Sequence, residues 1–157
     1  MSLLKPERRG PKPRKPIARR VRPRGSRTPV ALQEHRTLEQ RADRLWSFLV
    51  RHKSPLCVRC HCRPTAQADH LISRRYRATR WSTEIGAPLC AGCHQLVTAD
   101  THEHVRLAVL VLGAGRWELL NLAKTAGKCD PRMAIIALEA EVRAKGLTAL
   151  ALERGLL

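Results

Sequence analysis

Two Cys-x-x-Cys pairs constrain this chain more than any other feature of its sequence. The first pair is Cys57 and Cys60, and the second pair, Cys90 and Cys93, follows after 29 intervening residues. Each pair places two thiolates on one tight turn, and two such turns supply the four ligands of a tetrahedral zinc ion. The spacing favours Cys60 over Cys62, which is the alternative ligand. We therefore expect a structural zinc site.

The charge of the chain is the second constraint. Thirty Lys and Arg residues against 13 Asp and Glu give a net charge of +17. An excess of this size attracts a polyanion, and it favours nucleic acid as the partner over an acidic membrane surface. The longest apolar stretch, 107–115, is far shorter than the roughly 20 residues of a membrane span. The N-terminus has no apolar leader, so we expect a reducing, cytoplasmic location and metal binding rather than disulfides.

Composition divides the chain into a tail and one domain. Residues 1–27 contain eleven Lys and Arg, one Glu and five Pro, so this segment carries +10 of the net charge. Such a segment cannot bury enough apolar surface to fold, and we expect a disordered basic tail. The tail either contacts nucleic acid or only keeps the chain soluble. Residues 28–157 are expected to form a single domain.

Periodicity predicts that this domain is mainly helical. Thr28-Pro29 is typical of a helix start, and apolar residues recur at spacings of three or four up to His52. Charges of alternating sign make this first helix a scaffold rather than a binding surface. Residues 54–98 are expected to form small strands and loops, with a helix beginning near Cys93. The expected fold class is α+β, with helices in 28–53 and 99–157 flanking a small zinc-bound core.

The C-terminal part, 99–157, is predicted to contain short helices that have a packing role. Apolar stretches at 104–112 and 117–126 are separated by glycines, and Asp130-Pro131 is typical of a third helix start that Gly146 would end. Ile135, Leu138 and Val142 would share one buried face of that helix. The lone Cys129 is expected to be a buried apolar residue.

Chemistry-bearing residues lie close to the cysteines in the sequence. Asp69-His70 lies between the two pairs, and His94 directly follows Cys93. If both turns meet at zinc, Asp69 and His94 could hold a second cation such as Mg²⁺ or Mn²⁺, while His70 acts on a water. Four arginines could grip flanking phosphates: Arg74, Arg75, Arg77 and Arg80.

This cluster resembles the HNH endonucleases that carry a four-cysteine zinc on a ββα-metal (treble-clef) motif. The resemblance rests on Cys57-x-x-Cys60, Asp69-His70-Leu71-Ile72 and Leu89-Cys90-x-x-Cys93-His94, within residues 54–98. It implies a metal-dependent nuclease acting on nucleic acid, most often double-stranded DNA. The stretch 73–81 and the Pro/Arg-rich leader resemble phage-encoded members, which implies the cytoplasm of a bacterial host.

The resemblance also implies a role for each residue of the motif. Asp69 and His94 take the places of metal ligands, and His70 takes the place of the general base. The middle Asn of the motif, which holds the loop carrying the base, is missing, and its place falls near Ile85 or Gly86. His102 and His104 match nothing in the motif and are expected to be exposed at a helix start.

Two other functions are compatible with the same residues. One is a non-catalytic zinc module that only binds nucleic acid, and the other is a phage accessory protein that uses a degenerate HNH fold for docking. One active site cuts one strand, so a double-strand break would need a dimer or two encounters. The sequence decides neither the cleavage specificity nor the choice between DNA and RNA.

Overall fold

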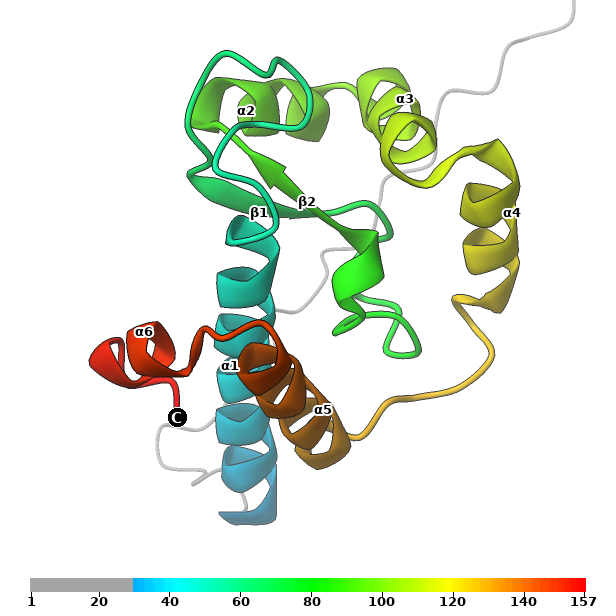
Figure 1. Ribbon diagram of the computed structural model, residues 1–157. Coiled ribbons are helices and arrows are strands. Elements are labelled where there is room, and N and C mark those ends of the chain that lie inside the picture. Colours follow the sequence, from blue (N-terminus) through cyan, green and yellow to red (C-terminus); the bar gives the residue numbers. More distant parts are fainter. Residues whose placement is uncertain (1–29) are drawn as a thin grey trace, which may run out of the picture.

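A long first helix, α1 (Val30–Arg51), supports both halves of the protein in the computed structural model, which describes residues 30–157. The expectations for the tail and for Thr28-Pro29 lie outside these residues. The predicted apolar stripe of α1 is confirmed, since Ala42, Leu45 and Leu49 are fully or almost fully buried. Figure 1 shows α1 standing between the hairpin at its C-terminal end and the C-terminal helices along its side.

The first hydrophobic core lies between α1 and α5 (Pro131–Ala144). Asp130 caps α5 through a hydrogen bond from the backbone N–H of Arg132, as the Asp-Pro start predicts. Ile135, Leu138 and Val142 are buried on one face of α5, which confirms the predicted packing role. The short helix α6 (Thr148–Glu153) follows and buries Ala151 in the same core.

A two-stranded antiparallel hairpin crosses the C-terminal end of α1. Its strands are β1 (Gln67–His70) and β2 (Gly86–Leu89), with Gln67 opposite Leu89 and His70 opposite Gly86. A short 3₁₀ helix, η1 (Thr83–Ile85), leads into β2. Successive side chains on a strand point to opposite faces, so adjacent residues of β1 face different neighbours.

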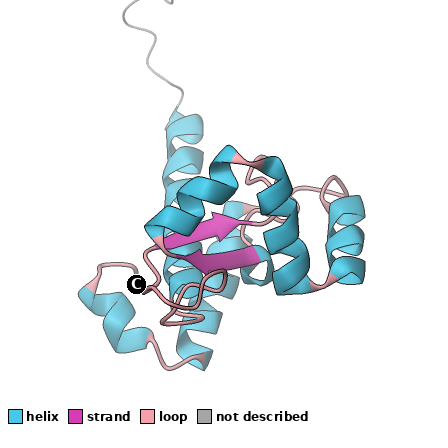
Figure 2. Cartoon of the chain, turned by 90° about the horizontal axis from the view of Figure 1, so that it is seen from above, coloured by secondary structure: helices cyan, strands magenta, loops and turns pink. Residues whose placement is uncertain are grey.

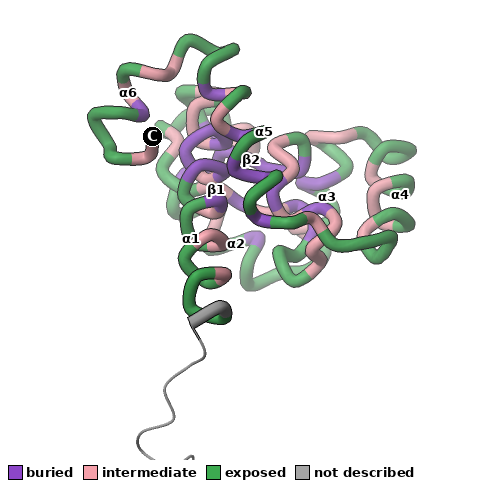
Figure 3. The backbone as a smooth tube through the Cα atoms, turned by 90° about the horizontal axis from the view of Figure 1, so that it is seen from below, coloured by how far each residue is buried: buried purple, intermediate pink, exposed green. Residues whose placement is uncertain are grey.

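The other face of the hairpin is covered by α2 (Ala91–Ala99) and α3 (Thr101–Leu112). These elements enclose a second core that includes Leu71, Ile85, Val97 and Leu107. Figure 2 shows the hairpin enclosed by helices, and Figure 3 shows buried backbone concentrated where the hairpin meets them. The helix α2 begins at Ala91, two residues before the predicted start.

The helix α4 (Ala114–Ala123) has no buried residue and extends outward from α3. The described part of the chain is therefore mainly helical with one small sheet, which agrees with the predicted α+β class. None of its helices is both long enough and apolar enough to cross a membrane.

Candidate functional site

The two Cys-x-x-Cys turns meet in space. Ligand atoms of Cys57, Cys60, Cys90 and Cys93 all lie within 4.8 Å of one another. The Sγ atoms of Cys60 and Cys90 are 4.0 Å apart, close to the roughly 3.8 Å that tetrahedral bonds of about 2.3 Å to zinc impose. A disulfide would need about 2.05 Å. The cluster can hold a structural metal such as zinc, and Cys62 is exposed outside it.

Backbone and side-chain donors around the cluster suit thiolate ligands. Cys90 caps α2 and accepts a hydrogen bond from the Cys93 N–H at 3.5 Å. A backbone hydrogen bond from Cys62 lowers the pKa of Cys60 to about 6, whereas burial raises the pKa of Cys93 to about 12. Arg59 donates to the Cys93 sulfur at 3.7 Å and to Glu103 at 2.8 Å, which ties the cluster to α3. A bound cation would keep all four thiols deprotonated.

Asp69 and His94 face each other between β1 and α2. Asp69 is 8% exposed, and its Oδ1 lies 3.5 Å from His94 Nε2. The buried Oδ2 accepts no hydrogen bond from residues 30–157. Asp69 and His94 are therefore adjacent, and a carboxylate and an imidazole are ligand types that a divalent cation accepts.

The structure adds His104, and the expectation that it would be exposed is wrong. His104 lies on the first turns of α3, is half-buried, and places Nε2 3.3 Å from Asp69 Oδ2 and 3.1 Å from the His70 carbonyl oxygen. Its N–H points to the carbonyl, so Asp69 gains an ionic contact but no hydrogen bond. The Asp69 carboxylate raises the pKa of His104. No local signal marks this residue, because only the packing of α3 brings it to β1; His102 is exposed, as expected.

His70 points to the opposite face of β1, toward α1. Its ring stacks on Trp46 with centroids 3.6 Å apart and planes 13° apart. Nε2 lies 3.0 Å from the Arg80 carbonyl oxygen, so Nε2 carries the proton and Nδ1 keeps its lone pair. Burial lowers the pKa of His70. A neutral imidazole with Nδ1 available is the form that can accept a proton.

The loop between the two strands is held by α1 rather than by an Asn. Trp46 donates to the Ser82 carbonyl at 2.9 Å, and Lys53 donates to the Gly86 carbonyl at 2.8 Å. At Gly86 an added Cβ would lie 2.2 Å from a Val50 methyl group. The helix therefore occupies the space that a motif side chain at this position would need.

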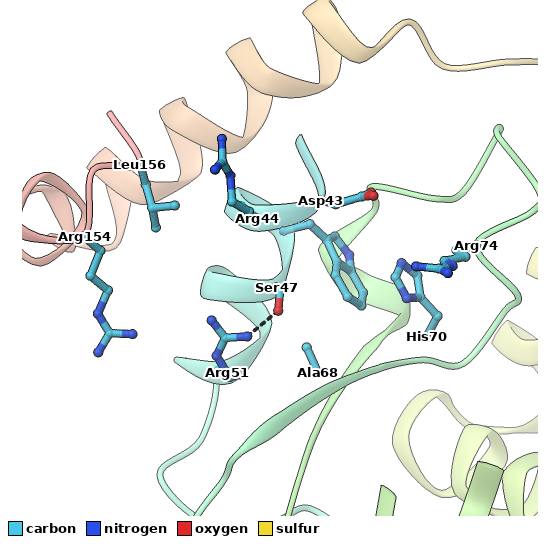
Figure 4. Close-up of a pocket in the computed structure, with 10 residues that line it drawn as sticks. Asp43, Arg44, Ser47, Arg51, Ala68, His70, Arg74, Arg154 and Leu156 are labelled. Atoms are coloured by element: carbon cyan, nitrogen blue, oxygen red, sulfur yellow. Dashed lines mark hydrogen bonds between the residues drawn. The ribbon is translucent and has the colours of Figure 1, made fainter. Parts of the chain in front are cut away.

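The four arginines proposed for phosphate contacts have different surroundings. Arg77 pairs with Glu39, and Arg80 donates to Asp43 at 3.1 and 2.7 Å. These two side chains fasten the loop to α1. Arg74 and Arg75 are exposed and form no ion pair within residues 30–157. Arg74 lines an open pocket beside His70, shown in Figure 4.

Cys129 is partly buried against the first core, close to its expected apolar role, and its thiol donates to the Asp130 carbonyl at 3.6 Å.

Comparisons of the chain with protein-family models, with curated proteins and with solved structures find no match. The function must therefore be inferred from the site itself.

Proposed function

We propose that this protein is a metal-dependent endonuclease of the HNH type that hydrolyses phosphodiester bonds in double-stranded DNA. One observation carries the proposal. His70 and Asp69 are neighbours on β1, yet their side chains serve opposite faces of the strand, and Asp69 meets His94 from α2. A base and a cation-binding pair thus lie at one end of β1. Phosphodiester hydrolysis needs a base to activate the water and a cation to stabilise charge on the phosphate.

The cysteine cluster supports this proposal as a zinc-bound treble-clef core. The hairpin and α2 follow one another in ββα order, and each cysteine pair lies next to one of these elements. In this interpretation zinc fixes the first turn against the start of α2. The position of His94, directly after Cys93, is then set by the metal cluster rather than by the second core alone.

His70 would act as the general base. The hydrogen bond from Nε2 to the Arg80 carbonyl orients the ring and leaves the Nδ1 lone pair as the proton acceptor. Stacking on Trp46 fixes the plane of the ring, so Nδ1 can take a proton from a water that attacks phosphorus. The water oxygen forms a bond to phosphorus as its proton moves to Nδ1, and the bond from phosphorus to the 3′ oxygen breaks; the 3′ oxygen leaves with the bonding electrons and takes a proton from solvent.

Asp69 and His94 would hold the divalent cation, Mg²⁺ or Mn²⁺. When bound, the cation neutralises charge on the phosphate and on the leaving oxygen. The ionic contact from His104 keeps the Asp69 carboxylate in place, and its hydrogen bond to the His70 carbonyl fixes the end of β1. His104 is therefore a positioning residue in this mechanism.

Gly86 favours a second candidate, a zinc module that binds nucleic acid without cutting it. The motif Asn has no counterpart at Ile85 or Gly86, and at Gly86 the close contact with Val50 leaves no room for one. In the nuclease proposal the bonds from Trp46 and Lys53 replace the function of the Asn. In the binding-module alternative they are structural only.

Plasmid nicking distinguishes the two candidates. Wild-type protein is compared with His70→Ala, Asp69→Ala and His94→Ala at increasing Mg²⁺ and Mn²⁺. We expect His70→Ala to lose roughly 10²–10⁴-fold in rate at every metal concentration, because a general base is missing. The other two variants should recover partly at high Mn²⁺. Absence of cleavage by wild-type protein with either cation would favour the binding module.

A further inference from the structure

An open pocket of about 480 Å³ adjoins His70 on the side of the hairpin away from the cysteines. Its walls come from α1, from β1 and from the C-terminal turn after α6. Figure 4 shows Arg154 and Arg74 at opposite ends of the pocket, with Arg44 and Arg51 between them. Guanidinium groups from α1, from the loop after β1 and from the C-terminal turn therefore meet at one pocket.

The positive charge of this pocket is not neutralised within residues 30–157. Its arginines form no ion pair there, and Arg51 only donates to the Ser47 hydroxyl. Asp43 is the one acidic residue in the lining, and it already accepts hydrogen bonds from Arg80 and from the Trp81 indole at 2.8 Å. The pocket thus offers four cations to a ligand.

Three other arginines of the domain are neutralised by a carboxylate. Arg41 pairs with Glu139, Arg59 with Glu103, and Arg116 with Glu84. Burial and the nearby charge of Arg154 together lower the pKa of Arg51, which indicates that the two guanidinium groups repel each other. An anion between them would remove this repulsion.

We propose that this pocket binds the phosphodiester backbone of nucleic acid beside the His70 site, with Arg44, Arg51 and Arg154 as phosphate contacts. This inference rests on the proposed function, because His70 forms one wall of the pocket and a strand reaching its Nδ1 would continue across the arginines. Guanidinium groups bind phosphate oxygens in a bidentate manner and suit a series of phosphates. The helix α1, predicted to be only a scaffold, would then supply part of the binding surface.

Binding to a fluorescent duplex of about 20 base pairs tests the proposal without any cleavage step. The full chain is measured without added divalent cation at several salt concentrations. The variant Arg44→Gln/Arg154→Gln is compared with Arg132→Gln/Arg143→Gln, which removes two exposed charges from α5 that likewise form no ion pair within residues 30–157. Thermal unfolding and zinc content confirm that both variants are folded.

We expect the pocket variant to bind about tenfold more weakly or worse, since each phosphate contact is a charged hydrogen bond. Its log–log salt slope should fall by about 1.8, from two phosphate contacts of about 0.9 each. Equal weakening in both variants, or none in either, would overturn the proposal. So would reduced binding to phosphatidylserine vesicles with duplex binding intact. Because cleavage is not measured, failure of the nuclease proposal would leave this result interpretable.

Discussion

Gly86 determines how closely the hairpin approaches α1. A Cβ at this residue would stand 2.2 Å from Val50 Cγ2 and 3.0 Å from the Trp46 ring. Substituting the motif residue, Gly86→Asn, should therefore lower the free energy of unfolding by about 1–3 kcal/mol rather than improve the site. Thermal unfolding measures this, and a Val50→Ala background should reduce the destabilisation. A fully stable Gly86→Asn single variant would mean that the two elements are less tightly packed.

His104 offers a second test at the scale of one side chain. Gln can still donate to the His70 carbonyl, whereas Ala cannot, so His104→Ala should lower the nicking rate about 10–100-fold and His104→Gln much less. DNA affinity should stay unchanged in both variants. If Ala and Gln raise the Mn²⁺ requirement equally, His104 is a metal ligand and not a positioning residue.

At the scale of elements, the sequence predicted features that depend on neighbouring residues better than features that depend on long-range packing. Asp130-Pro131 and the buried stripe of α5 follow from cap chemistry and periodicity, which depend on neighbouring residues. The cysteine set follows from ligand spacing. The proximity of His104 to β1 and of Gly86 to α1 arises only when distant elements pack, so no local pattern contains it. The same holds for Arg80, which was expected to bind phosphate but pairs with Asp43.

We expect the hairpin and α2 to depend on metal binding by the cysteine cluster, which lies beside both. A structural zinc ion contributes about 10–16 kcal/mol of apparent binding free energy in small domains. We expect Cys90→Ser to abolish zinc binding and to unfold the 54–98 region, as measured by metal analysis and amide hydrogen exchange. Cys62→Ser is the matched control, because its exposed thiol is not one of the four clustered ligands and zinc should be retained. Native protein without zinc would contradict this prediction.

Across the whole molecule, the proposed cation pair and the arginine pocket lie on opposite faces of β1. Asp69 faces α2 and α3, whereas Ala68 and His70 line the pocket against α1. The two hydrophobic cores fix the positions of these faces relative to each other, because α1 contacts both strands and α5 packs along α1.

The positive charge of the chain is divided between the tail and the rest of the chain, so each part can bind nucleic acid separately. Residues 1–27 carry +10 of the +17, and the rest of the chain carries +7. A tail that binds phosphates without selecting sequence should strengthen binding to all duplexes alike. Deleting residues 1–27 should therefore weaken binding uniformly and flatten the salt dependence, by about 0.9 in the log–log slope for each phosphate that the tail neutralises.

The pocket gives this prediction a quantitative control. If the tail and the pocket bind separate phosphates, the decrease in slope on deleting the tail and the decrease in Arg44→Gln/Arg154→Gln should add in the combined variant, because independent sites contribute additively. Salt titrations against one duplex measure this directly for wild type, the tail deletion, Arg44→Gln/Arg154→Gln and the combined variant. An unchanged slope after deletion would mean that the tail does not touch nucleic acid. A combined decrease smaller than the sum would mean that the tail and the pocket arginines compete for the same phosphates.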